Sequence, residues 1–126
     1  MKLSTTLFAL PLLLACGAAA EAACVYPQAP QSLPNGTQAT KEEMLAAQTQ
    51  VKEYSKNVQE VYLPCLEQEK TAAVAALDSV DAEYTAKAAA IESVHAKKHN
   101  AALDELTALA NRWNTERKAY AEAQKK

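Results

Sequence analysis

Glycine and proline, the residues that most often interrupt regular structure, are scarce in this chain. The 126 residues include two glycines and five prolines, and from Thr37 onward there is no glycine and only one proline, Pro64. A segment that lacks them and is rich in Ala, Glu, Lys, Gln and Leu predicts long helices. For that segment, their absence also excludes a phosphate-binding glycine loop and the glycine-bearing turn that exposes a catalytic serine.

Motifs of catalysis and of cofactor binding are missing as well. The sequence has two histidines, and neither belongs to an HExxH zinc motif or to a CxxCH haem motif. The formal net charge of −2 gives no reason to expect nucleic acid or an anionic membrane surface as a partner. We therefore expect a protein that is not an enzyme and that carries no cofactor.

Residues 1–22 have the layout of a secretory signal peptide. A basic residue near the start is followed by the mostly apolar residues 3–15 and then by small, alanine-rich residues. Cleavage after Ala22 would release a soluble periplasmic or secreted protein. Alternatively, residues 13–16 resemble a bacterial lipobox, in which Cys16 would be lipidated and the protein would be an outer-membrane lipoprotein. We expect membrane attachment only in the second case.

The cysteines form an even pair once Cys16 is set aside. Cys16 lies in the signal segment or is lipidated, which leaves Cys24 and Cys65 in an oxidising compartment and predicts a disulfide bond between them. The reach of the chain allows this bond. An extended chain from Cys24 to Thr40 covers about 50 Å, whereas a helix from Thr40 to Cys65 is about 37 Å long.

The remainder of the chain divides into an arm and a helical domain. Residues 23–39 contain three prolines, no charged side chain and an Asn-Gly turn at 35–36, which predicts an extended, proline-rich arm. Residues 40–126 form the helical domain. Since about 100 residues remain after the signal segment, we expect one domain at most.

A first helix is predicted over residues 40–76. Thr40 and Glu43 fit a capping box at its start, and Pro64 should kink it. Apolar residues recur in alternating steps of three and four, as they do where one helix packs along another. This stripe consists of Met44, Ala47, Val51, Tyr54, Val58, Val61 and Cys65.

A second helix is predicted over residues 82–124, after a turn at 78–81. Its stripe, counted at about 3.6 residues per turn, consists of Tyr84, Ala88, Ile91, His95, Lys98, Ala102, Leu106, Leu109, Trp113, Glu116 and Tyr120. The predicted fold class is therefore all-α, an extended proline-rich arm followed by a long antiparallel helical hairpin. The alternative is a three-helix arrangement, broken near Pro64 and again near residues 99–100.

Charge is distributed unevenly along the helical domain. Residues 40–96 contain five Lys and ten Asp or Glu, a net charge of −5, whereas residues 97–126 contain seven Lys or Arg and four acids, a net charge of +3. Two antiparallel helices with these charges attract one another, although each charged run can equally be a solvated face. Because two helices alone bury little apolar surface, the two stripes lead us to expect self-association into a four-helix arrangement.

Two sets of side chains are candidates for binding. His95 and His99 lie four residues apart on a helix, and with Glu92 they could hold a divalent metal ion. The competing interpretation places His95 at the edge of the packed stripe and His99 in solvent.

The second candidate set is aromatic. Trp113, Arg117 and Tyr120 stack at helical spacing, and these residue types dominate the energetic centres of protein interfaces. They would form a partner-binding patch, although such a stripe is more often part of the core.

Several short motifs carry a resemblance to known proteins. They are Cys24 with its nearby prolines, YLPCL at 62–66, KHNAALDEL at 98–106 and NRWN at 111–114. Together they resemble a group of short exported proteobacterial proteins of unknown function. The resemblance implies a bacterial envelope protein with paired cysteines and a long C-terminal helix, and it implies no activity.

The sequence thus predicts a non-enzymatic exported envelope or periplasmic protein that acts through helix-mediated protein interaction, with itself or with an unknown partner. One alternative is a lipid-anchored structural lipoprotein, favoured by the lipobox and by the terminal Lys125 and Lys126, since some small envelope lipoproteins are joined to the cell wall through a final lysine. Another is periplasmic metal binding or chaperone-like binding through the two candidate sets.

Overall fold

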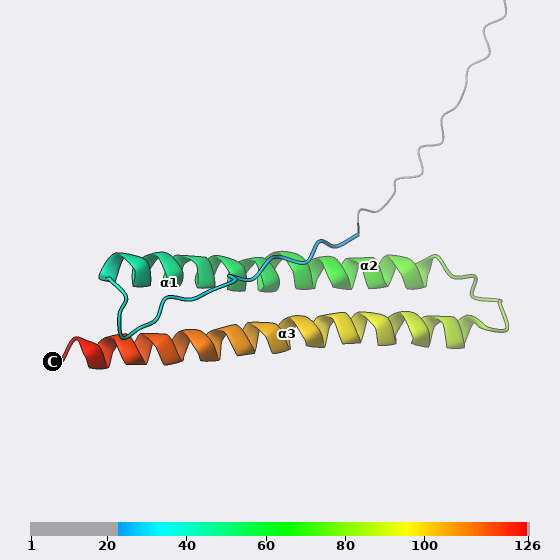
Figure 1. Cartoon of the computed structure of the whole chain (residues 1–126). Coiled ribbons are helices and arrows are strands. Elements are labelled where there is room, and N and C mark those ends of the chain that lie inside the picture. Colours follow the sequence, from blue (N-terminus) through cyan, green and yellow to red (C-terminus); the bar gives the residue numbers. More distant parts are fainter. Residues whose placement is uncertain (1–22, 126) are drawn as a thin grey trace, which may run out of the picture.

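The chain folds into an extended arm and two long antiparallel helical segments (Figure 1). The computed structural model describes residues 23–125. The first helical segment comprises α1 (Lys41–Lys56), the π-helical turn η1 (Asn57–Tyr62) and α2 (Leu63–Ala75), and the second is α3 (Tyr84–Ala123). The predicted all-α hairpin with an N-terminal arm is therefore confirmed. The proposed signal segment and Cys16 lie outside the described residues, as does Lys126.

The predicted capping box starts α1. The Thr40 hydroxyl accepts a hydrogen bond from the Glu43 backbone N–H at 3.2 Å, and the Glu43 carboxylate accepts one from the Thr40 N–H at 2.7 Å. These two bonds satisfy two N–H groups that a helix start would otherwise leave without a partner. The negative charges of Glu42 and Glu43 also suit the positive end of the helix dipole.

The first segment was predicted to kink at Pro64, but the irregularity lies just before the proline. The backbone stays helical through Asn57 and Leu63, and the departure from α-helical geometry is the π-helical turn immediately before the proline. In this turn the Leu63 N–H donates to the Val58 carbonyl, five residues earlier. Pro64 then falls in the first turn of α2, where a missing N–H is tolerated.

The π-helical turn also shifts the buried stripe by one residue. As predicted, Met44, Ala47, Val51, Tyr54 and Val58 are buried. Beyond them the prediction was wrong: Val61 is 62% exposed and Cys65 only partly buried, while Tyr62 and Leu66 face the core. A π-helical turn contains more residues than an α-helical turn, so every later side chain is rotated relative to a regular heptad.

The turn between the two segments lies at the predicted position. The Asp78 carboxylate accepts from the Val80 N–H at 3.1 Å, and the Asp81 carboxylate accepts from the Glu83 N–H at 2.7 Å. These side-chain bonds to the backbone two residues on are typical of aspartate in turns. The second helix begins at Tyr84, two residues later than predicted.

The helix α3 is continuous from Tyr84 to Ala123, as the hairpin prediction required, and the break near residues 99–100 of the three-helix alternative does not occur. Of the eleven stripe positions predicted for this helix, ten are buried or partly buried, and Lys98 alone is exposed. Leu109 of α3 and Val58 of the first segment are the largest fully buried side chains. Hydrophobic packing therefore runs in one seam between the two segments, and the arm supplies further side chains to it.

Candidate functional site

The arm is fastened to the first helical segment by a disulfide bond. Cys24 and Cys65 are joined, with their Cα atoms 5.8 Å apart and a sequence separation of 41. The predicted pairing is confirmed. Cys65 is able to reach the arm because the shifted stripe turns it out of the seam between the helices. Closing a loop of this length stabilises the fold by about 4 kcal/mol through the entropy of the unfolded chain.

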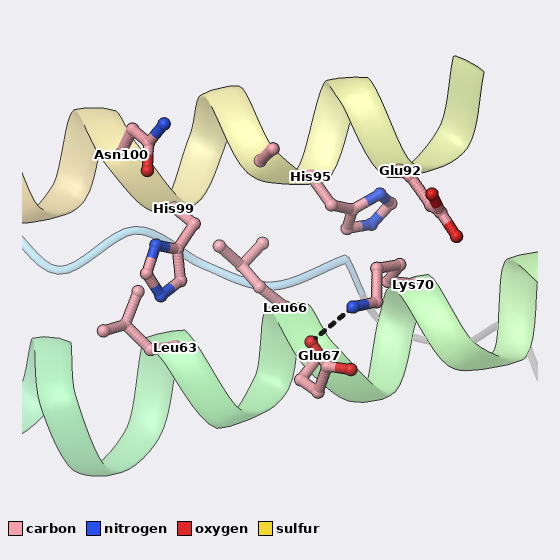
Figure 2. Close-up of a pocket in the computed structure, with 9 residues that line it drawn as sticks. Leu63, Leu66, Glu67, Lys70, Glu92, His95, His99 and Asn100 are labelled. Atoms are coloured by element: carbon pink, nitrogen blue, oxygen red, sulfur yellow. Dashed lines mark ion pairs between the residues drawn. The ribbon is translucent and has the colours of Figure 1, made fainter. Parts of the chain in front are cut away.

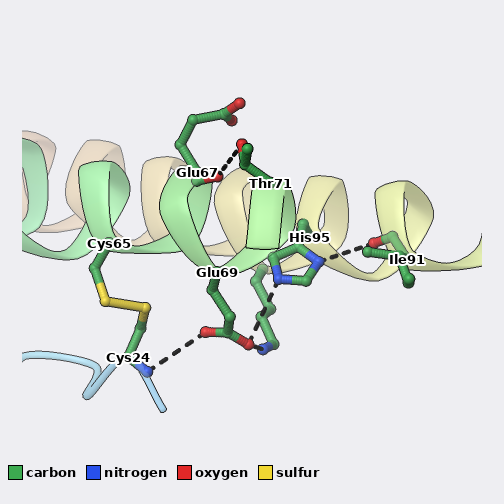
Figure 3. Close-up of polar contacts among 8 residues, drawn as sticks. Cys24, Cys65, Glu67, Glu69, Thr71, Ile91 and His95 are labelled. Carbon is green, nitrogen blue, oxygen red and sulfur yellow. Dashed lines mark hydrogen bonds and ion pairs between the residues drawn. A yellow bond between two sulfur atoms is a disulfide. The ribbon is translucent and has the colours of Figure 1, made fainter. Parts of the chain in front are cut away.

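A carboxylate next to the bridge ties three parts of the molecule together (Figure 3). Glu69 of α2 accepts a hydrogen bond from the Cys24 N–H at 3.4 Å and pairs with Lys98 of α3 at 3.1 Å. The Nε2 atom of the buried His95 ring lies 3.5 Å from the same carboxylate, and its Nδ1 lies 2.9 Å from the Ile91 carbonyl. The hydrogen bond from Lys98 is the main reason why the pKa of Glu69 is lowered, with smaller contributions from the Cys24 N–H and His95.

A second fastening point is Tyr26 of the arm. Its hydroxyl lies 2.8 Å from the Tyr54 hydroxyl of α1 and donates to the Glu105 carboxylate of α3 at 2.6 Å. Its ring meets Tyr62 edge to face, with the ring centres 4.9 Å apart. Burial raises the pKa of Tyr26 well above its usual value, and the hydrogen bond to Glu105 raises it further. Burial also raises the pKa of Tyr54.

The third fastening point is the tip of the arm, at the predicted Asn35–Gly36 turn. The Gly36 N–H donates to the Glu116 carboxylate of α3 at 2.7 Å. A Cβ atom on Gly36 would lie 1.9 Å from the Glu116 backbone carbonyl oxygen and 2.8 Å from the Tyr120 backbone nitrogen. Glycine is thus required here because the arm touches the α3 backbone directly, and not because of a positive φ angle.

The predicted metal ligands line one pocket between α2 and α3 (Figure 2). Glu92, His95 and His99 contribute to a cavity of about 520 Å³, with Leu63 and Leu66 on the α2 side. However, within residues 23–125 no three His, Cys, Asp or Glu side chains are close enough together to hold a metal ion. His95 faces Glu69 and the Ile91 carbonyl, as the packed-histidine interpretation requires, while His99 is exposed.

The predicted aromatic patch is split between the core and the surface. Trp113 is 9% exposed and belongs to the hydrophobic core, and Tyr120 is partly buried against that core. Arg117 is exposed. The three side chains therefore do not form one exposed surface, and Trp113 has the core position that its place in the stripe indicated.

Within residues 23–125, the arm covers one face of the hairpin and leaves the other face uncovered. Successive side chains of an α-helix are rotated by about 100° around its axis, so each residue of α3 can be placed on one side or the other of the buried stripe. Glu105 and Glu116, which contact the arm, lie on one side. Glu92 and His99, which line the pocket, lie on the other side. The same division holds for the first segment, where Tyr54 contacts the arm and Leu63 lines the pocket.

We call the uncovered side the open face. It is defined by Leu63, His99, Leu103, Leu106 and Ala110. Leu103 is 38% exposed, and Leu63 and Leu106 are partly buried. Long apolar side chains in solvent along a packed hairpin are typical of a surface that binds another element. On α3, Leu103 and Ala110 are the apolar residues of the open face that lie outside the predicted buried stripe, and two such residues give no periodic signal in the sequence.

The comparisons with known proteins add no relative. No family model matches the chain, no curated protein is significantly similar, and no solved structure matches the fold. Within the described part of the chain, no helix combines the length and the hydrophobicity that crossing a bilayer requires.

Proposed function

We propose that this chain is an exported, disulfide-stabilised envelope protein that acts by offering a helical surface to a protein partner and catalyses no reaction. The observation that carries the proposal is the two-sided hairpin. A disulfide-bonded arm covers one face, and leucine side chains such as Leu103 remain exposed on the other.

The disulfide bond supports the export part of the proposal. A bridge between Cys24 and Cys65 is stable in an oxidising compartment such as the periplasm, whereas cytosolic thiols are kept reduced. It joins Cys24, at the start of the arm, to Cys65 in the first turn of α2. Export therefore contributes directly to the fold, because the bridge that fastens the start of the arm is stable only in an oxidising compartment.

The interaction part is supported by the shape of the hairpin. Two helices bury a narrow seam, and in this molecule the arm completes only one side of it. Helix pairs of this kind commonly bury their remaining apolar face against further helices, as in four-helix bundles. A binding role accounts for the leucines of the open face without requiring any catalytic group.

Two measurements test the proposal. The first is the intact mass of the protein isolated from its native envelope, with and without reductant. We expect a chain that starts at Ala23 and gains the mass of two hydrogen atoms on reduction. A chain that starts at Cys16 with acyl groups would instead support the lipoprotein alternative. An unprocessed chain with free thiols would contradict the export proposal.

The second measurement locates the interaction. A photoreactive amino acid replaces Leu103 on the open face or, as a control, Lys97, which is exposed on another side of α3. Irradiation of cells should crosslink the Leu103 variant to protein and leave the Lys97 variant free. Absence of any protein crosslink at Leu103, in a variant that keeps its disulfide bond, would contradict an interaction through the open face.

A further inference from the structure

We propose that the open face is a homodimer interface, on which a second copy of this chain lies antiparallel so that α3 packs along the α3 of the second copy. The inference rests on the proposed function and specifies its partner. It follows from the order of side chains on the open side of α3, from their charges and from the area that the face offers.

The open side of α3 is complementary to itself when it is reversed. In chain order it presents Glu92, His99, Leu103, Leu106, Ala110 and Arg117. Leu103 and Leu106 are equally distant in sequence from the midpoint between residues 104 and 105. The same midpoint lies halfway between Glu92 and Arg117. Two α3 helices paired antiparallel about this point therefore place leucine opposite leucine at the centre and carboxylate opposite guanidinium at both ends.

The two end charges are available for such a pairing. Glu92 and Arg117 are both exposed, and neither forms an ion pair within residues 23–125. An antiparallel dimer would contain two symmetry-related pairs of Glu92 with Arg117. Rim pairs of this kind contribute modestly to affinity, but they select the orientation and register of the two subunits.

The same charges disfavour the parallel alternative. In that arrangement the two-fold axis runs along the helices, and α3 packs on the first segment of the second copy. The C-terminal end of α3 then lies beside the start of α1 of the second copy. Arg117 would then approach Lys41 at the start of α1, which lies on the open side of that helix by the same count of about 100° per residue. Like charges brought together in an interface oppose association, so the antiparallel arrangement is the one that the side chains favour.

The face is large enough for a stable dimer. The paired segments are about 50 Å long at 1.5 Å per residue, and two packed helices present a surface about 20 Å wide. The face therefore measures on the order of 1,000 Å², compared with the roughly 800 Å² per partner that specific complexes usually bury. A closed two-fold dimer of this kind buries the exposed leucines of both copies.

Sedimentation of the disulfide-bonded protein over about 1 to 100 µM, a range that detects micromolar dissociation constants, tests the proposal. We expect a dimer for the natural chain. Arg117→Glu alone and Glu92→Arg alone should each weaken it by about tenfold, since each creates two like-charge contacts. Combining both changes in one chain recreates the pairs with reversed sign and should restore the dimer.

Matched controls separate this effect from a general change in charge. Lys118→Glu and Glu122→Arg make the same charge changes at exposed positions away from the open face, and they should leave the dimer unchanged. Leu103→Asp should give a monomer whose helical circular dichroism is intact. The inference is overturned by a natural chain that stays monomeric over the whole range, or by a double variant that is no more dimeric than the single variants.

The two proposals fail in different ways. A monomeric protein that still crosslinks through Leu103 to a different envelope protein would overturn the dimer and leave the proposed function in place. An unprocessed protein with reduced cysteines would overturn export, whatever its oligomeric state.

Discussion

Replacing Gly36 with alanine should destabilise the protein, although alanine can adopt the local backbone conformation. Gly36 has no positive φ angle, and a glycine-to-alanine change at a compatible position usually stabilises by about 0.4–1 kcal/mol, because alanine restricts the unfolded chain. Here the sign should be reversed. The added Cβ would lie 1.9 Å from the Glu116 carbonyl oxygen, and this neighbour is helix backbone that cannot rotate away.

The magnitude follows from what the arm loses when its tip moves off α3. The Gly36 N–H gives up a 2.7 Å hydrogen bond to the Glu116 carboxylate, and a bond to a charged group is worth about 1.5–3 kcal/mol. Subtracting the gain from the restricted unfolded chain leaves a net loss of about 1.5 kcal/mol. The loss is limited because the bridge at Cys24 continues to hold the other end of the arm.

Urea denaturation followed by circular dichroism measures this change. The exposed neighbour Gln38→Ala is the control and should shift the free energy of unfolding by less than about 0.5 kcal/mol. Glu116→Gln should cost much less in the Gly36→Ala background than in the natural chain, since the shared hydrogen bond is already lost. A Gly36→Ala variant as stable as the natural protein would refute the direct contact between arm and helix.

Other parts of the arm give further predictions. Changing Cys24 and Cys65 together to serine should lower the free energy of unfolding by about 4 kcal/mol, measured by denaturation against the oxidised natural chain; an unchanged midpoint would contradict the bridge. Tyr26→Phe should cost about 1–2 kcal/mol because it leaves two hydrogen-bonding partners without the hydroxyl, and the absorbance of the natural protein should show a tyrosine that does not ionise near pH 10 while folded. Glu69→Gln should cost about 1 kcal/mol at neutral pH. The pKa of Glu69 is lowered from 4.5, so its contribution is present above that value and is lost as the pH falls through the lowered pKa; a difference between variant and natural chain that persists in acid would contradict the pairing with Lys98.

Much of the fold could be predicted because its signals are local. Three features depend on residues that are only a few positions apart in the sequence: the capping box at Thr40, the turn at 78–81 and the long stripe of α3. Each of them is found in the structure. The disulfide bond could be predicted because only Cys24 and Cys65 remained to pair. These features depend on backbone chemistry and cysteine number more than on distant packing.

The first segment shows where a regular count fails. The heptad count holds to Val58 and then selects Val61 and Cys65, whereas the structure buries Tyr62 and Leu66. The π-helical turn depends on how Tyr62 and Leu66 fit against α3 and the arm, which are distant in sequence. The local sequence therefore contains no pattern that predicts the turn. Pro64 was a sign of irregularity in this region, but it could not show that the stripe would advance by one residue.

The fastening points of the arm were hidden for a different reason. Tyr26 and Glu105 are 79 residues apart, and the Gly36 and Glu116 of the arm tip are 80 residues apart. The extended arm has no charged side chains and no hydrophobic periodicity, so its sequence does not predict which residues of the hairpin it contacts. Its register along the hairpin is set by the position of Cys65, which the π-helical turn orients, and by the close approach of Gly36 to α3.

The arm also determines what kind of assembly the hairpin can form. A bare pair of amphipathic helices has two grooves, so copies could stack on both sides and grow without limit, since contacts between different surfaces do not close. Here the disulfide-bonded arm fills one groove with its own side chains, including Tyr26 and Leu33. In the proposed dimer the open face is the surface that associates, and a face that pairs with itself about a two-fold axis closes at two copies. Reduction of the bridge should therefore do more than destabilise the fold. By freeing the arm it would expose the second groove, and the dimer should give way to larger species in sedimentation. A reduced protein that remains strictly dimeric would show that the arm has no part in limiting assembly.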